Sequence, residues 1–233
     1  GLVGHSRAAL LEPGVPLPLE ADFAPASLGC AGDRKFTLSL GLALRQSAQP
    51  MTRPVDPSLA ARALDLARAA LARRGAPSEL PSRLLVVDVE RQRAILLEGG
   101  EARGTWPVST ARAGIGGTQN SYRTPPGWHR VHRRIGQEAE AGCVFASREP
   151  TGETWTGEAC DDDLILTRIL TLDGLEDGVN RGPGHDSLER YIYLHGTNHE
   201  RLLGRPVSHG CIRLSNADIC SLFTEMREGD HVL

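Results

Sequence analysis

One cysteine near the C-terminus stands among residues that could make its thiol reactive. Cys211 directly follows Ser208-His209-Gly210, and His195 lies sixteen positions upstream. The thiolate, not the thiol, attacks carbonyl carbon, and an imidazole can supply that ionisation by taking the proton. The sequence therefore predicts a cysteine nucleophile with a histidine base.

The neighbours of Cys211 indicate how an acyl group could be handled. Gly210 permits a sharp turn directly before the thiol, where backbone N–H groups can face a developing oxyanion. Arg213 lies two positions beyond Cys211, hence on the same side of an extended segment. Its permanent cation could favour the thiolate or bind a substrate carboxylate. His195 ends a run of alternating rings and aliphatic side chains at 191–194, which is typical of a strand and would hold the base rigidly.

These residues resemble the signature of a known family, the L,D-transpeptidases, whose catalytic domain is called YkuD. The resemblance rests on His195-Gly196-Thr197 and on the run Ser208-His209-Gly210-Cys211-Ile212-Arg213-Leu214. Upstream, Thr124-Pro125-Pro126-Gly127 is similar to the Thr-Pro-x-Gly segment that the family carries before a strand, and Asn216 and Asp218 fit the pattern after the cysteine. The resemblance covers roughly residues 83–233 and nothing in 1–54.

The resemblance implies a cysteine-dependent peptidoglycan L,D-transpeptidase. Cys211 would attack the carbonyl after the third residue of a tetrapeptide stem, release D-Ala and leave a thioester, and an amine acceptor on another stem or an anchored protein would take the acyl group. His195 would be the base, oriented by a backbone carbonyl near Gly196. His209 would help to shape an oxyanion and substrate region that includes Gly196, Ser208, Gly210 and Arg213. A β-lactam such as a carbapenem is the implied inhibitor, no cofactor is implied, and the location is periplasmic or elsewhere in the cell envelope.

Other functions remain open on residue types alone. With water as acceptor, the same thiol would make an L,D-carboxypeptidase or a peptidoglycan amidase. A zinc site could use His195, His199, His209 and Cys211, whose donor atoms suit that metal, although we find no clear base beside them for a bound water. A cell-wall binding module with a dead site is disfavoured because every reactive residue type is present.

Composition excludes several classes of partner. The chain has 233 residues, 40% of them hydrophobic, and a formal net charge of −3. No polybasic field for nucleic acid is evident. No apolar run approaches the roughly 20 residues that a membrane span needs, and no signal peptide is visible.

Cysteine usage gives a second constraint. Five cysteines is an odd number, so one thiol is left over if the others pair within the chain, and Cys211 is the natural candidate. Cys143 and Cys160 flank a loop that a disulfide could close. Cys30 stands alone in an irregular region. We interpret Cys220 as a small buried hydrophobic residue, the usual role of an isolated cysteine.

Three segments are predicted along the chain. Residues 1–54 are a proline- and glycine-rich extension with one possible strand at 36–44. Residues 55–82 hold a helix and a linker, since Asp56-Pro57 is a typical helix start and Gly75 a typical end. The helix has an apolar stripe (Leu59, Ala63, Leu66, Ala67 and Ala70) that favours packing on the domain over a membrane surface. Residues 83–233 are the catalytic domain.

The catalytic domain reads as mainly β, of α+β type. Short runs of branched residues predict strands at 84–89, 94–98, 105–109, 128–133, 144–147, 164–170 and 191–194, with a last strand at 231–233. A helix is predicted from the cap at Ser215 to about Arg227. The expected fold is a YkuD-like β-sandwich or partly closed barrel with peripheral helices. Segment 139–163 is a long insertion, either a solvated loop or a lid with Trp155 as its apolar contact.

Overall fold

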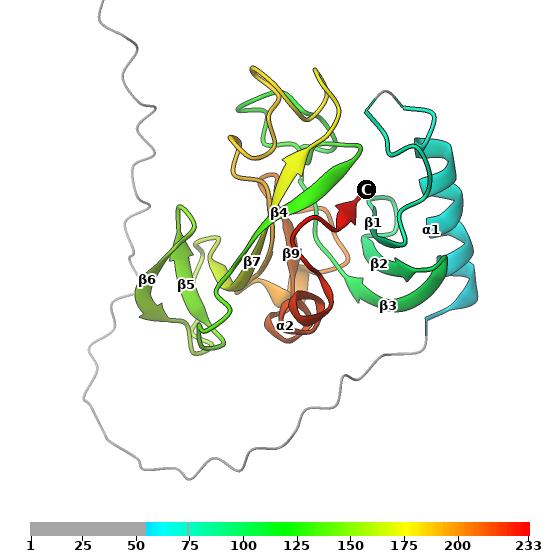
Figure 1. Cartoon of the computed structure of the whole chain (residues 1–233). Helices are drawn as coiled ribbons and strands as arrows, with labels where there is room; N and C mark the ends of the chain where they lie inside the picture. Colours follow the sequence, from blue (N-terminus) through cyan, green and yellow to red (C-terminus); the bar gives the residue numbers. More distant parts are fainter. Residues whose placement is uncertain (1–54, 74) are drawn as a thin grey trace, which may run out of the picture. The chain divides into compact units, whose positions relative to one another are not determined.

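The computed structural model describes residues 55–73 and 75–233. Within this part, two α-helices and one 3₁₀ helix accompany ten strands that belong to a single mixed sheet (Figure 1). The predicted strand at 36–44 and Cys30 lie outside the described residues. The prediction of a mainly β fold is confirmed.

One α-helix precedes the ten strands and the other lies between the last two of them. The helices are α1 (Pro57–Ala70), the 3₁₀ helix η1 (Glu200–Leu202) and α2 (Asn216–Glu225). The strands are β1 (Arg83–Asp88), β2 (Arg93–Glu98), β3 (Glu101–Pro107), β4 (His129–Ile135), β5 (Cys143–Ala146), β6 (Glu149–Thr154), β7 (Ile165–Gly174), β8 (Tyr193–Gly196), β9 (Ile212–Leu214) and β10 (His231–Val232).

The sheet is branched and does not close on itself. Its main path runs in the order β3-β2-β1-β10-β4-β7-β5-β6, and β8 and β9 branch from β7. Pairing is parallel between β1 and β10 and between β8 and β9, and antiparallel elsewhere. Figure 1 shows α1 beside β1–β3 and the β5–β6 hairpin at the other end of the sheet. The branch strands β8 and β9 are the ones that flank the predicted site.

The predicted strands are found within a few residues of their expected bounds, and β9 covers the segment after Cys211 that was expected to be extended. Two differences remain. β7 continues to Gly174, past the predicted end, because residues 172–174 pair with β4 (Arg130 with Asp173). β6 was not predicted, since every residue in it is exposed and it contains Pro150 and Gly152. About half of the insertion 139–163 is therefore a β-hairpin, and residues 155–163 are irregular.

Helix α1 begins as predicted and ends earlier. The Asp56 carboxylate accepts the N–H of Ser58 at 2.8 Å and Pro57 occupies the first turn. The helix stops at Ala70, before the predicted end at Gly75; the Ala70 carbonyl accepts the indole N–H of Trp128 at 2.9 Å and the backbone N–H of Arg73 at 3.1 Å. A side chain of the domain thus satisfies a carbonyl at the helix end.

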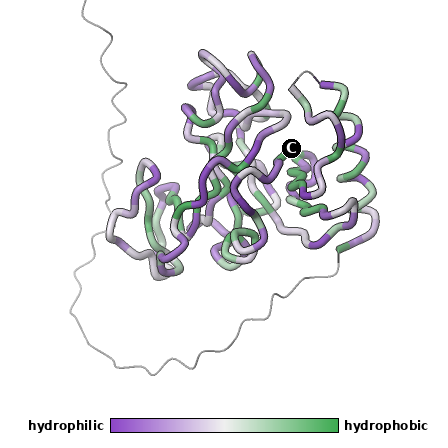
Figure 2. The backbone as a smooth tube through the Cα atoms, in the orientation of Figure 1, coloured by the Kyte–Doolittle hydropathy of each residue, from purple (hydrophilic) through white to green (hydrophobic). Residues whose placement is uncertain are grey.

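The apolar side chains gather where the helices cover the sheet. Ala63, Ala67 and Ala70 of α1 pack with β1, β2 and Trp128, as the predicted stripe requires, while Ile219, Leu222 and Phe223 of α2 pack with the central strands. Figure 2 shows the hydrophobic residues on these facing segments and a hydrophilic outer strand β6. The prediction that α1 packs on the domain is confirmed. Neither α-helix of the described part has the length and apolar composition that crossing a membrane requires.

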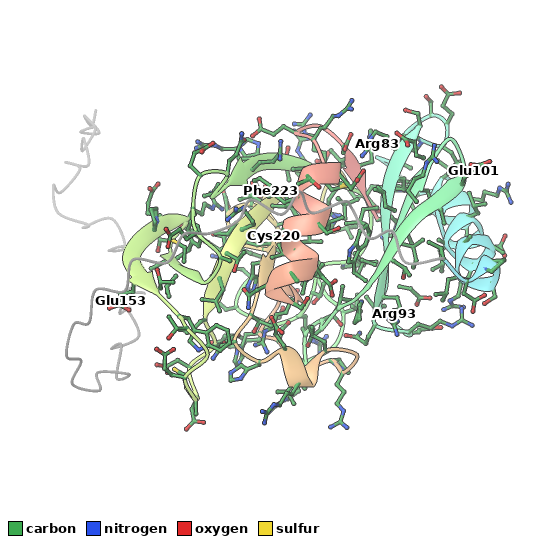
Figure 3. The ribbon with its side chains drawn as sticks, turned by 90° about the horizontal axis from the view of Figure 1, so that it is seen from below. Arg83, Arg93, Glu101, Glu153, Cys220 and Phe223 are labelled. Atoms are coloured by element: carbon green, nitrogen blue, oxygen red, sulfur yellow. The ribbon has the colours of Figure 1, made fainter. Side chains whose placement is uncertain are left out.

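Helix α2 also carries Cys220. In Figure 3 the helix lies over the middle of the sheet, with Cys220 and Phe223 on it and with Glu153 and Glu101 at the two ends of the sheet. Cys220 is half-buried, so it is more exposed than the buried hydrophobic residue that we expected. Burial still raises the pKa of its thiol. Cys143 has a free, buried thiol, so the candidate disulfide to Cys160 is not formed.

A buried carboxylate fastens α1 to the domain, and its removal gives a stability prediction. Glu176, 3% exposed, accepts the backbone N–H of Trp128 and the Nε–H of Arg73, each at 2.7 Å. Glu176→Ala should lower the free energy of unfolding by about 2–3 kcal/mol, because a buried donor loses its acceptor while the half-exposed Arg73 regains water. Urea denaturation measures this change.

The matched control is Asp65→Ala, which removes an exposed carboxylate of α1 that lies 3.9 Å from Arg68. It should leave stability nearly unchanged, since exposed ion pairs contribute little. Equal stability of the Glu176 and Asp65 variants would show that the Glu176 contacts do not hold α1 in place.

Candidate active site

Two short parallel strands bring the predicted histidine and cysteine together. β8 carries His195, and β9 begins directly after Cys211. Their register pairs Leu194 with Ile212 and His195 with Arg213. Residues paired across strands share a face and side chains alternate along each strand. His195, Cys211 and Arg213 are therefore presented on one side of this pair.

The His195 ring is held in a defined tautomer. It is buried, and its Nδ1 lies 2.7 Å from the carbonyl oxygen of Gly196, the carbonyl near Gly196 that we expected. Because a carbonyl only accepts, Nδ1 carries the proton and Nε2 of the neutral ring keeps its lone pair. Burial lowers the pKa of His195 below its ordinary value, which keeps the ring neutral near pH 7. The ring can therefore accept a proton at Nε2.

The Cys211 thiol is protonated at rest. Its S–H points to the carbonyl oxygen of Tyr191 at a distance of 3.3 Å. Burial raises the pKa of Cys211 to about 12, although the backbone N–H of Tyr193 acts in the opposite direction. A thiol with this pKa is almost entirely uncharged near neutral pH, so attack requires a base to remove the proton.

The turn before the thiol is fixed by three hydroxyl contacts. Ser208 Oγ donates to the carbonyl of Cys211 at 2.6 Å and accepts the N–H of Gly210 at 3.2 Å. Thr124 Oγ donates to the Gly210 carbonyl at 2.8 Å. Gly210 has φ 136°, which side chains rarely adopt, and a Cβ there would lie 3.2 Å from the side chain of Ile192. The turn thus depends on glycine and ties the Thr-Pro-Pro-Gly segment to the cysteine.

A second set of contacts supports the turn after His195. A Cβ on Gly196 would lie 2.5 Å from Oδ1 of Asn216, so only glycine fits beneath that side chain. The Asn216 amide donates to the carbonyl of Thr197 at 3.0 Å and to Glu200 at 2.9 Å. Asn216, which matched the family pattern, therefore fixes the backbone that orients the His195 ring.

One carboxylate links two of the predicted site residues. Asp163 Oδ2 accepts from Arg213 Nη2 and lies 3.1 Å from His209 Nδ1. The Arg213 side chain is 3% exposed, whereas that of His209 is 71% exposed. His209 therefore lies at the rim of the site, while Arg213 is enclosed beside the thiol.

Comparison with known proteins identifies the family of the chain. The family model described as the L,D-transpeptidase catalytic domain, YkuD, matches residues 82–233, more than half of the chain. The chain belongs to the L,D-transpeptidase family. The match begins after α1, so the helix that Glu176 fastens lies outside the matched residues.

The sequence identity between this chain and individual L,D-transpeptidases is low. The chain is 28% identical over 174 residues to a probable L,D-transpeptidase, YbiS, of Escherichia coli K12, with 70% of this chain and 50% of that protein covered. The chain thus spans about half the length of the curated relatives it matches. Among solved structures, L,D-transpeptidase 3 from Mycobacterium tuberculosis in complex with a faropenem-derived adduct is 19% identical, with TM-score 0.43 and 66% and 60% of the two chains covered. An L,D-transpeptidase from Xylanimonas cellulosilytica is 22% identical, with TM-score 0.39 and 71% and 67% covered.

Sequence reasoning missed the residues that the 139–163 insertion brings to this candidate site. Asp163 belongs to an acidic run that looked like a solvated loop. Asn198 holds that run in place, since its amide donates to the Asp162 carbonyl at 2.8 Å and its oxygen accepts the Leu164 N–H at 3.1 Å. The one hint in the sequence is that Asn198, which binds this run, lies three residues after His195.

An arginine connects the hairpin of the insertion to β8, the strand that carries His195. Arg148, between β5 and β6, donates to the hydroxyl of Tyr193 at 2.9 Å and to the carbonyl of Leu188, and its guanidinium lies 4.4 Å from the ring centre of Tyr191. Trp155, the expected lid contact, instead bonds within the insertion, to the Glu158 carbonyl at 2.9 Å. The hairpin is therefore anchored beside the site by a cation and not by an indole.

The zinc hypothesis gains no support from the geometry. Across residues 55–73 and 75–233, no three His, Cys, Asp or Glu side chains are arranged so that they could hold a metal ion. His195 uses Nδ1 for the Gly196 carbonyl and His209 turns to Asp163. The predicted ligands therefore do not converge on one point.

A separate cavity of about 440 Å³ lies between α1 and the sheet. Its lining includes Leu66 of α1, Ile192 and Ile212, and it does not include His195 or Cys211. Side chains alternate along a strand, so Ile212 faces away from Cys211 and Arg213, its neighbours in sequence, and Ile192 faces away from Tyr193. The cavity therefore lies on the side of these strands opposite the thiol. It is not the candidate active site.

Proposed function

We propose that this chain is a cysteine-dependent peptidoglycan L,D-transpeptidase of the cell envelope, with Cys211 as nucleophile and His195 as base. The observation that carries the proposal is the tautomer of His195. Its Nδ1 is committed to the Gly196 carbonyl, which leaves Nε2 basic on the face that presents the Cys211 thiol. Membership of the L,D-transpeptidase family supplies the substrate class.

Acylation begins from a neutral pair. As Sγ of Cys211 bonds to the carbonyl carbon after the third stem residue, its proton passes to Nε2 of His195 and the carbonyl oxygen becomes an oxyanion. The imidazolium then gives that proton to the leaving nitrogen as the C–N bond breaks, which releases D-Ala and leaves a thioester. An acceptor amine attacks the thioester and returns its proton through His195 to the thiol.

The oxyanion would be stabilised by backbone N–H groups at the turn before the thiol. The Gly210 N–H is engaged by Ser208 Oγ at 3.2 Å, which favours the N–H of Cys211 itself as the main donor. His209 would act at the rim, through its contact with Asp163, because its ring is largely exposed.

The acceptor and the inhibitor also belong to this proposal. An amine on a second stem, an amine on an anchored protein, a free D-amino acid or water would give cross-linking, protein attachment, exchange or trimming by the same thioester. A β-lactam, whose carbonyl is a strained electrophile, would acylate the same thiol. Faropenem leaves an adduct on the M. tuberculosis relative.

Product analysis tests the proposal. Incubation with a disaccharide-tetrapeptide should yield cross-linked dimer and free D-Ala, read by mass spectrometry. Added D-amino acid should be exchanged into the fourth position, because it competes as an amine for the thioester. Release of D-Ala with trimmed tripeptide alone would show an L,D-carboxypeptidase, and an unchanged substrate would contradict the proposed function.

A further inference from the structure

Arg213 is a buried cation with an incomplete set of partners. Its side chain is 97% buried on the side of β9 that presents Cys211, and Nη2 donates to Asp163. Its Nε is buried and has no hydrogen-bond partner among the described residues. A buried guanidinium normally satisfies its donors, so the unused Nε indicates a missing acceptor.

The geometry of the guanidinium specifies what that acceptor is. Arginine presents Nε–H and one Nη–H side by side, and a carboxylate fills both with its two oxygens. Asp163 uses one oxygen, Oδ2, for both Arg213 and His209. Asp163 therefore uses only one of the two adjacent donors, Nη2, and leaves Nε without an acceptor, although a carboxylate could bind both.

Asp163 is also held less firmly than Glu176 and Asp88, the two most buried carboxylates that pair with arginine in the described residues. Glu176 accepts a backbone N–H in addition to Arg73, and Asp88 accepts two backbone N–H groups in addition to Arg62. Both are nearly fully buried, at 3% and 2% exposed, whereas Asp163 is 27% exposed and accepts no backbone N–H from the described residues. Its attachment depends on the neighbouring surface segment and Asn198.

We propose that Asp163 holds the place of a substrate carboxylate on Arg213 and is displaced when the acyl donor binds. This inference rests on the proposed function for the identity of the donor. Arg213 stands two residues from Cys211 along an extended segment, roughly 7 Å away at the backbone. Two carboxylates of a stem peptide lie near the scissile carbonyl: the C-terminal carboxylate of the fourth residue and a side-chain carboxylate on the third.

Binding to a variant without the nucleophile separates this inference from the reaction. Titration calorimetry on Cys211→Ala would compare a tetrapeptide with a third-residue side-chain carboxylate, the same peptide amidated at its C-terminus, and a peptide with lysine at the third position. Loss of the recognised carboxylate should weaken binding at least about tenfold, and the peptide affected identifies the source. Equal affinity for all three peptides would overturn the inference.

Variants of the ion pair test the displacement itself. In the Cys211→Ala background, Asp163→Asn should bind the carboxylate peptide about three- to tenfold more tightly, because the internal competitor has lost its charge. Asp161→Asn, which removes an equal charge two positions away, should leave affinity unchanged. Arg213→Gln should abolish the difference between the carboxylate and amide peptides. Weaker binding by Asp163→Asn would show that Asp163 only supports Arg213, and this outcome does not depend on the folding of the Arg213 variant.

The two proposals fail in different ways. A protein that discriminates the peptides as expected but transfers no acyl group would refute the proposed function and keep the carboxylate site. A protein that transfers acyl groups yet binds all three peptides equally would refute the carboxylate site and keep the proposed function.

Discussion

Replacement of Cys211 by alanine should abolish acyl transfer, by more than about a thousandfold, while the protein stays folded. The reason is that the reaction proceeds through a bond to Sγ, and the half-buried site tolerates a small side chain. The rate of dimer formation from a disaccharide-tetrapeptide measures the loss, and circular dichroism with thermal unfolding measures the fold. Transfer that survives in Cys211→Ala would end the thiol hypothesis.

The matched control is Cys220→Ala on α2. This thiol is also half-buried but projects from a helix that packs on the sheet, so its removal should change stability more than turnover. If Cys220→Ala eliminates turnover in a folded protein, the roles of the two cysteines are assigned wrongly.

Removal of the His195 imidazole should lower acylation of Cys211 about 10²- to 10⁴-fold at neutral pH, because a thiol with a pKa of about 12 is almost entirely protonated there. In His195→Ala the rate should rise with pH as the thiolate fraction rises, about tenfold per unit. The rise should continue well past pH 8.5, where an ordinary cysteine levels off, because burial raises the pKa of Cys211. The wild-type rate should instead reach its plateau by neutral pH, since burial lowers the pKa of His195.

The comparison variant is His209→Ala. His209 is exposed and bonded to Asp163, so its loss should lower turnover modestly, with the pH profile of the wild type. The measurement is the rate of β-lactam adduct formation across pH for both variants. Alkaline rescue confined to His209→Ala would reverse the assignment and make His209 the base.

Much of the fold could be predicted because its signals are local. Alternating or branched runs gave the strands, and Asp56-Pro57 and Ser215 gave the starts of both α-helices. The end of α1 was not predicted, since one of the donors to its last carbonyl, the indole N–H of Trp128, is 58 positions away from Ala70. β6 was missed because an exposed edge strand with Pro150 and Gly152 has no hydrophobic pattern.

The candidate site also combines residues that local sequence signals indicate with residues that they do not. The candidate residues close in sequence to the thiol could be named from the sequence, and His195 Nδ1 contacts the Gly196 carbonyl, near which the family resemblance placed such a contact. Asp163 and Arg148 were not found, because they reach the site from an insertion whose position depends on contacts of Asn198 and Tyr193. Neither Asp163 nor Arg148 has a spacing from the thiol that marks it, although their partners Asn198 and Tyr193 lie within three residues of His195.

The claim that Cys211 is the reactive nucleophile is tested most directly by covalent trapping. A carbapenem added in excess should increase the mass of the wild-type protein by one equivalent of drug, because a strained carbonyl meets a thiol with a base and an oxyanion turn. Peptide mapping should place the adduct on Cys211. A protein that remains unmodified after prolonged excess, or one that carries the adduct on Cys143 or Cys220 instead, would contradict this account.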